Sequence, residues 1–219
     1  MTTVVAIDGP AGSGKSSVSR ETARRLGYGF LDTGAAYRAL TWWALDLEID
    51  LQDGEAIARL LADFPYSISL DPDREHIRVG EVEVTEAIRE PRISLNVSAI
   101  ATQPRVREWM KDFTRRLVAS STYPGVVAEG RDMTTVVFPD AEARILLTAR
   151  QEVRIARRAG ETVATADVTA KSISERDAKD STVVDFMNAA PGVVVVDSSD
   201  IGFDETVDTV VGLCTGGTS

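Results

Sequence analysis

The sequence has very little of the side-chain chemistry that builds thiol and metal sites. Its 219 residues include one cysteine, Cys214, and one histidine, His76. A single cysteine excludes an internal disulfide framework and a zinc site made of several thiolates, and it suits a reducing compartment. A single histidine excludes a metal site with two imidazole ligands. A Ser-His-Asp triad would have to use His76, which lies in a polar, strand-like stretch.

Long apolar runs and an excess of positive charge are also missing. No uninterrupted apolar stretch approaches the roughly 18 residues that suggest a membrane span. Apolar periodicity begins at Val4, which leaves no room for a signal peptide. The formal net charge of -10 argues against general affinity for nucleic acid, whose phosphates favour a basic face. We therefore expect a cytoplasmic protein with no nucleic-acid or membrane partner, in which any anion site is local.

Short apolar, β-branched runs separated by helical patterns indicate the fold class. Such runs lie at Thr3–Ile7, 126–128, 145–147 and 193–196, with a brief extended stretch at 28–31. Nearly all-apolar strands are typical of a parallel sheet that is buried on both faces. The sequence therefore predicts an α/β fold, a three-layer, doubly wound parallel sheet in a single domain over residues 1–219.

The pattern changes to strict alternation between residues 65 and 85. Tyr66–Leu70 and His76–Val79 alternate apolar and polar side chains, Asp71–Pro72–Asp73 gives a turn signal, and Val82–Val84 follows. This predicts a small antiparallel sheet inserted between helices. One surrounding helix is expected to begin at a cap residue, Thr33. Further helices are expected over residues 55–64, 93–102, 104–120 and 203–213.

The predicted elements divide the chain into three parts. The core is expected over residues 1–32, 104–149 and 169–219, the inserted lobe over 33–103, and a helical lid over 150–168.

A glycine-rich loop between the first strand and the first helix carries the clearest chemistry. Residues Gly9 to Ser16 fit the pattern G-x-x-x-x-G-K-[ST]. Its backbone N–H groups and the following helix N-terminus attract phosphate, Lys15 reaches the β and γ phosphates, and the Ser16 hydroxyl can ligate Mg²⁺. The sequence therefore predicts an ATP site formed by Gly9, Pro10, Ala11, Gly12, Ser13, Gly14, Lys15, Ser16 and Ser17, with Ser16 as the metal ligand.

Four arginines gather on one face of a predicted helix. Arg150, Arg154, Arg157 and Arg158 stand at helical spacing in a protein that is acidic overall. One interpretation is a solvated basic face paired with Glu152 or Glu161. The other is a mobile lid whose arginines close over the transferring phosphates and neutralise their charge.

Two further arginines follow predicted strand ends. Arg38 lies near the start of the helix that follows the extended stretch at 28–31, and Arg131 lies just after the strand at 126–128. Because the carboxyl ends of strands in a doubly wound sheet line the ligand crevice, both are aimed at the same place as the glycine loop. The two arginines could hold a second phosphate group there.

Taken together, the motifs resemble those of the bacterial cytidylate kinase family, a branch of the nucleoside monophosphate kinases. The resemblance spans nearly the whole chain. It rests on IDGPAGSGKS at 7–16, LDTGAAYR at 31–38, PRVRE at 104–108, GRDM at 130–133, VVFPDA at 136–141 and ERDAKDS at 175–181. The family implies a P-loop kinase fold with a nucleoside-monophosphate-binding lobe, and the small sheet at 66–84 is similar to the insert that distinguishes this family.

The resemblance also implies roles for individual residues. It assigns CMP binding to Thr33, Arg38, Ser98, Arg107, Arg131, Asp132, Arg176 and Asp180, ATP contact to Arg157, and catalysis to Lys15, Arg131, Arg154, Arg158 and Arg176. Ser98, Arg107 and Asp132 would read cytosine. A carboxylate can accept from the cytosine amino group and a guanidinium can donate to N3 or O2, whereas uracil would place a carbonyl against Asp132.

Four positions depart from the family pattern. Val183 stands where the family usually has arginine, which implies an altered ribose grip or a changed preference between CMP and dCMP. Glu129 often appears as aspartate and Thr134 as glycine, and Thr33 stands where serine is common.

The expected activity is in-line transfer of the γ-phosphoryl group of ATP, bound with Mg²⁺, to CMP or dCMP by a monomer. Three alternatives remain. Another P-loop small-molecule kinase would differ in its acceptor. A GTPase switch would need an Asn-Lys-x-Asp segment, which the sequence lacks. A nucleotide-binding module without catalysis would bind ATP and form no acceptor-dependent ADP.

Overall fold

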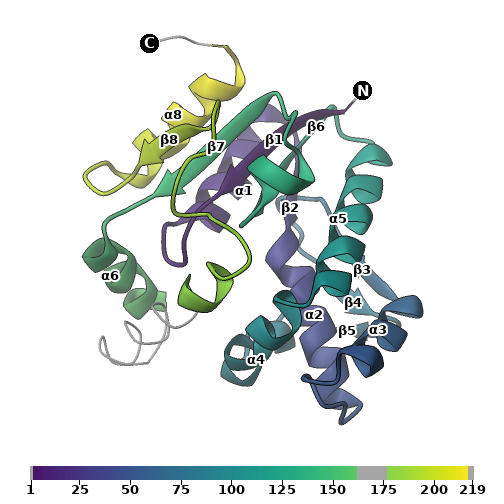
Figure 1. Cartoon of the computed structure of the whole chain (residues 1–219). Coiled ribbons are helices and arrows are strands. Elements are labelled where there is room, and N and C mark those ends of the chain that lie inside the picture. Colours follow the sequence, from purple (N-terminus) through teal and green to yellow (C-terminus); the bar gives the residue numbers. More distant parts are fainter. Residues whose placement is uncertain (1, 162–176, 217–219) are drawn as a thin grey trace.

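A five-stranded parallel sheet forms the centre of the molecule (Figure 1). This computed structural model describes residues 2–161 and 177–216. The strands run in the order β2-β6-β1-β7-β8, and every neighbouring pair is parallel. They are β1 Thr3–Asp8, β2 Gly29–Asp32, β6 Gly125–Gly130, β7 Ala143–Thr148 and β8 Val194–Asp197. The predicted α/β class and parallel sheet are confirmed.

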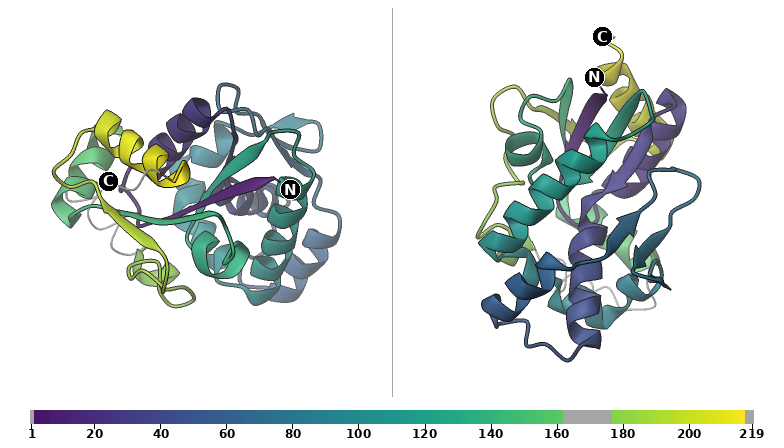
Figure 2. Two further views of the ribbon diagram at one scale, coloured as in Figure 1. Left: turned by 90° about the horizontal axis from the view of Figure 1, so that it is seen from above. Right: turned by 90° about the vertical axis from the view of Figure 1, so that its right-hand side faces the viewer.

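Helices cover both faces of the sheet, which completes the three predicted layers (Figures 1 and 2). On one face, α1 (Lys15–Leu26) and α8 (Phe203–Cys214) share a buried cluster with the strands. On the other face, α5 (Pro104–Ala119) and a short π-helix, Met133–Val137, form a second cluster. Because both faces bury apolar side chains, the central strands can be almost entirely apolar.

The inserted lobe follows β2 and carries the predicted small sheet. It contains α2 Thr33–Asp46, α3 Gly54–Ala62, β3 Tyr66–Ile68, β4 Ile77–Val79, β5 Val82–Glu83, the 3₁₀ turn Ala87–Arg89 and α4 Pro91–Ala101. The three short strands pair antiparallel in the order β3-β4-β5.

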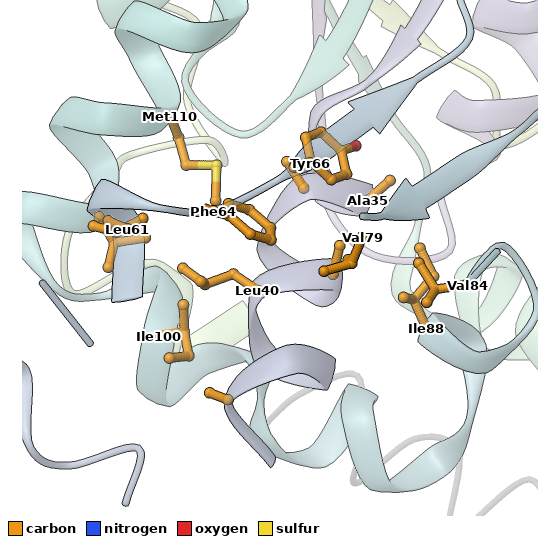
Figure 3. Packing of buried hydrophobic residues seen from close by; sticks show 14 of the residues in the cluster. Ala35, Leu40, Leu61, Phe64, Tyr66, Val79, Val84, Ile88, Ile100 and Met110 are labelled. Atoms are coloured by element: carbon orange, nitrogen blue, oxygen red, sulfur yellow. The ribbon is translucent and has the colours of Figure 1, made fainter. Parts of the chain in front are cut away.

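The lobe has a hydrophobic core of its own, separate from the two sheet clusters (Figure 3). Leu40 and Ile57 are fully buried in it, and the first half of α5 adds Met110. A run of aromatic rings crosses this core, with the Trp43 and Phe64 centroids 5.5 Å apart and those of Trp109 and Phe113 5.0 Å apart. Helix α5 therefore packs against both the lobe and the sheet.

The cap of helix α2 differs from the prediction. Asp32, not Thr33, is the N-cap: its carboxylate accepts a hydrogen bond from the Ala35 N–H at 3.1 Å. The Thr33 hydroxyl instead donates to the carbonyl oxygen of Glu129 at 2.7 Å, which joins the helix to β6. Both residues are good caps, so the sequence alone could not separate them.

Several element boundaries also differ. Strand β3 ends at Ile68, two residues before its predicted end. Helix α3 begins at Gly54, directly after its N-cap Asp53, and ends at Ala62 instead of the predicted Phe64. Strand β8 is an edge strand, so Val194 and Val195 are exposed although the sequence reads as a buried run.

The predicted lid coincides in part with helix α6, Gln151–Glu161. Residues 162–168 of the predicted lid lie outside the described ranges, and the division into core, lobe and lid stays a prediction. Within residues 2–161 and 177–216, none of the helices combines the length and the apolarity needed to cross a membrane.

Candidate active site

The register of the sheet brings three carboxylates to one edge. Asp8 at the end of β1 lies beside Gly130 of β6, and Asp32 at the end of β2 lies beside Glu129. The glycine loop follows β1 directly. This edge is the carboxyl end of the parallel strands, where ligands bind in open α/β sheets.

The glycine loop has the backbone that its sequence predicts. Gly12 and Gly14 adopt φ of +76° and +86°, a region in which other residues are strained. A Cβ on Gly12 would also lie 2.6 Å from the carbonyl oxygen of Arg154, so helix α6 packs tightly against the loop. Helix α1 starts at Lys15 with no acidic residue in its first turn, which leaves its positive end available to an anion.

Lys15 lies opposite a buried carboxylate. Its ammonium nitrogen is 3.6 Å from a carboxylate oxygen of Glu129, whose residue is only 2% exposed. Burial raises the pKa of Glu129, and the positive charge of Lys15 and a hydrogen bond from Ser16 partly offset that rise. Lys15 and Ser16 are thus held at the same carboxylate, next to the place where the loop would seat phosphate.

Arg38 joins this cluster from the lobe side. Its guanidinium is 2.6 Å from the Asp32 carboxylate, and most of both side chains is buried. Burial alone would raise the pKa of Asp32, but the charge and hydrogen bond of Arg38, with the charge of Lys15, lower it below the usual value. Arg38 also contributes to the electrostatic environment of Glu129. The proposed acceptor arginine therefore lies in the same polar cluster as Lys15.

Three arginines in helix α6 or directly before it, Arg150, Arg154 and Arg157, differ in their contacts. Arg154 donates to the carbonyl oxygen of Ala11 at 2.9 Å, and Arg157 donates to that of Ser13 at 3.1 Å, so both contact the loop. Arg150 pairs with Asp200 at 2.6 Å and also with Glu152, at the surface. These surface pairs of Arg150 agree with the interpretation as a solvated basic face, and the lid stays a prediction.

Arg131 reaches the loop from the end of β6. Its guanidinium donates to the carbonyl oxygen of Gly9 at 2.9 Å and lies 3.2 Å from carboxylate oxygens of both Asp177 and Asp180. The ring of Phe186, which is 1% exposed, stacks under it with 4.2 Å between the guanidinium carbon and the ring centroid. Arg131 is thus fixed on several sides beside the loop.

Two of the three residues expected to read the base, Arg107 and Asp132, form an ion pair. Arg107 of α5 is 2.5 Å from the carboxylate of Asp132, which is 7% exposed. Burial raises the pKa of Asp132 and Arg107 counteracts it. Burial also raises the pKa of Tyr37, and the neighbouring charge of Asp132 adds to that rise. Ser98 of α4 donates to Asp180 at 3.5 Å, a weak contact that links the lobe to the Arg131 cluster.

Asp8 has a supporting role that the sequence motifs did not predict. This residue is 2% exposed, and its carboxylate accepts hydrogen bonds from the N–H groups of Met133 and Thr134 and, at 2.6 Å, from the Thr134 hydroxyl. These bonds tie the π-helix to the end of β1 and thereby support the segment that carries Arg131 and Asp132. A carboxylate directly before the glycine loop was the only available signal.

Two predicted site side chains lie outside the described part of the chain, and two residues that contact Arg131 were not predicted. Arg176 and the side chain of Arg158 lie outside the part of the chain that the structure describes. Val183, at the position where the family usually has arginine, is 41% exposed. Asp177 lies within the motif ERDAKDS, but neither its contact with Arg131 nor that of Phe186 could be predicted, because both form only in the tertiary fold.

Comparison with known sequences gives one consistent result. The cytidylate kinase family model matches residues 5–215. The chain is 42% identical over 213 residues to a cytidylate kinase from Streptomyces avermitilis, covering 96% of this chain and 91% of that one. It is 43% identical to the cytidylate kinase of Bdellovibrio bacteriovorus, with 95% of each chain covered.

Solved structures support the fold. A Thermus thermophilus protein, TT1252, superposes with a TM-score of 0.52 at 16% identity and covers 100% of this chain and 98% of its own. An uncharacterized protein from Eubacterium ventriosum gives 0.54 at 11% identity, with 98% and 99% covered. These structures show a shared fold only. The family match across nearly the whole chain, together with its two close relatives, shows that this protein belongs to the cytidylate kinase family.

Proposed function

We propose that the protein transfers the γ-phosphoryl group of ATP to CMP or dCMP, giving ADP and CDP or dCDP. One observation carries the proposal: the glycine loop with Lys15 and the two arginines expected to hold the acceptor, Arg38 and Arg131, meet at the same edge of the sheet. In this proposal, a donor pocket built from main-chain amides would adjoin an acceptor pocket built from guanidinium groups.

The donor side needs no covalent chemistry from the protein. The loop amides and the positive end of α1 would hold the β and γ phosphates, and Lys15 would neutralise charge that develops on the transferring group. Arg154 and Arg157 already contact the loop through the carbonyl oxygens of Ala11 and Ser13. They would therefore need only a small movement to reach ATP.

Magnesium fits this site as a partner of the nucleotide. Within the described residues no group of three or more histidine, cysteine, aspartate or glutamate side chains could hold a metal. Mg²⁺ commonly keeps several waters and binds through one or two protein groups and substrate phosphates, so the Ser16 hydroxyl beside Glu129 is a suitable ligand. Bound there, the ion would draw electron density from the phosphate oxygens.

The acceptor side would use the ion pairs seen in the structure. Arg38 and Arg131 would hold the monophosphate, with Thr33 beside them. Asp132 and Arg107 would recognise cytosine, since their 2.5 Å contact places an acceptor next to donors. Arg176 and Asp180 are proposed for the ribose.

Some expectations rest on the sequence and family alone. We infer a monomer in the cytoplasm that works in pyrimidine nucleotide metabolism, with core, lobe and lid divided as the sequence predicts. The lobe has a separate hydrophobic core, which supports its movement as a unit on acceptor binding.

An acceptor panel tests the activity. ADP formation from ATP and Mg²⁺ is measured with CMP, dCMP, UMP, AMP and no acceptor. The proposal expects the highest kcat/KM for CMP or dCMP and very little ADP without acceptor. A preference for AMP or another acceptor would identify a different P-loop kinase, and equal ADP formation with and without acceptor would indicate hydrolysis.

A further inference from the structure

Asp177 lies at the junction of the two proposed phosphate pockets. One carboxylate oxygen accepts a hydrogen bond from the N–H of Ala11, in the glycine loop, at 3.2 Å. The same oxygen is 3.2 Å from Arg131, and the other oxygen accepts from Arg154 at 2.7 Å. Asp177 is 8% exposed, so these contacts are largely shielded from water.

The donors around this carboxylate are those expected around a phosphate. A loop N–H and two arginines, one on the acceptor side and one on the donor side, converge on a single anion. Guanidinium groups and loop amides bind carboxylate and phosphate oxygens with similar geometry. A side-chain anion of this protein therefore already has the contacts that a substrate phosphate would seek.

The same arginines are anchored to the loop by further bonds. Arg131 donates to the carbonyl oxygen of Gly9 and Arg154 to that of Ala11, each at 2.9 Å. Together with the contacts of Asp177, these bonds form a network that links the glycine loop, the two guanidinium groups and the carboxylate. Asp180 adds a second carboxylate to Arg131 at 3.2 Å, so the two acids balance the charge of the two arginines.

A substrate phosphate and Asp177 would compete for this place. The Ala11 N–H has one hydrogen and can serve only one acceptor well. A phosphate placed beside the buried carboxylate would also meet strong repulsion between like charges at low effective dielectric. Movement of Asp177 away from these donors would relieve both conflicts.

We propose that Asp177 is a positioning residue that holds Arg131 and Arg154 against the glycine loop before substrate binds and yields these donors to substrate phosphate. This rests on the proposed function for the identity of the substrate. The binding of a polyphosphate anion to the loop can be examined independently of turnover.

The first test is anion affinity in Asp177→Asn, an isosteric variant that removes the competing charge. Inorganic tripolyphosphate is titrated into wild type and variant by calorimetry, at low and at high ionic strength. We expect the variant to bind about tenfold more tightly, and to retain most of this gain at high salt, because a buried contact is weakly screened. Unchanged or weaker binding, or a gain that disappears in salt, would refute the proposal.

Two further variants serve as controls. Asp200→Asn removes the same charge from the exposed pair with Arg150 and should bind tripolyphosphate like wild type. Asp177→Glu keeps the charge and should not show the gain.

The second test uses the unmodified protein, so it does not depend on the folding of a variant. Amide hydrogen exchange is measured with and without tripolyphosphate. If the anion displaces Asp177, the helical segment over residues 177–180 loses its anchor and its amides should exchange faster. Unchanged or slower exchange there would show that Asp177 stays in place and would refute the proposal. Neither test needs CMP, so failure of the acceptor panel would remain a separate result.

Discussion

Replacing Asp132 with asparagine removes one negative charge from the proposed base pocket and changes the shape of the side chain very little. Asp132 is 7% exposed and lies 2.5 Å from the guanidinium of Arg107. In the proposed complex its carboxylate accepts a hydrogen bond from the amino group of cytosine. Asparagine keeps one carbonyl oxygen and replaces the other oxygen with an NH₂ donor.

The size of the effect follows from this contact. A hydrogen bond to a charged group contributes about 1.5–3 kcal/mol, and each ~1.4 kcal/mol is a factor of ten. We therefore expect kcat/KM for CMP to fall about 10- to 100-fold in Asp132→Asn. The new NH₂ group can donate to the uracil carbonyl, so UMP should lose much less. Because the base is not at the transferring phosphorus, the change should appear mainly in KM.

Steady-state ADP formation with CMP and with UMP measures both quantities. Thermal unfolding of the same preparations checks that Arg107, deprived of its carboxylate, has not destabilised the fold. Asp112→Asn, an exposed change on the same helix as Arg107, is the matched control and should keep both kcat/KM values. A folded Asp132→Asn variant that retains the wild-type ratio of CMP to UMP use would show that this carboxylate does not read the base.

Three other substitutions test separate parts of the site. Lys15→Met should lower kcat at least about a hundredfold in the same assay, because it removes a charge aimed at the transferring group; retained turnover would contradict that role. Phe186→Leu should lower kcat/KM about tenfold by removing the ring under the acceptor-side arginine, whereas Phe203→Leu, at an exposed ring, should not. Thr134→Val should lower the free energy of unfolding by about 1–3 kcal/mol at neutral pH in urea denaturation. Burial raises the pKa of Asp8 and the Thr134 hydrogen bond lowers it, so this bond stabilises the ionised carboxylate. The loss of unfolding free energy in Thr134→Val should therefore become smaller as the pH falls through the raised pKa of Asp8. A loss that does not change with pH would contradict this account.

The parts of the site that were predictable are those encoded by contiguous residues. The strand, glycine loop and helix around Lys15 follow local rules of backbone conformation, and Arg38 and Arg131 could be placed because they follow strand ends. The parallel sheet was also predictable, since its central strands are buried on both faces. Edge strand β8 looked the same in sequence, because an apolar run does not tell which strand has only one neighbour.

The missed contacts all join segments that are distant in the chain. Asp177 meets Arg131 and Ala11 only after the last third of the chain has folded back onto the loop. In the sequence, Arg150 cannot be distinguished from the other three arginines on the same helical face. In the structure it pairs with Asp200. Helical spacing places side chains on a face, but the partner of that face is decided by tertiary packing.

The aromatic core of the lobe supplies a built-in optical reporter. All three tryptophans, Trp42, Trp43 and Trp109, pack against that core, so the tryptophan emission of the protein arises from the lobe side of the molecule. A shift in emission on adding nucleotide would report rearrangement of the lobe without any attached dye. Changes confined to the glycine loop would leave this emission unchanged. Donor binding and acceptor binding could therefore be distinguished in one fluorescence experiment.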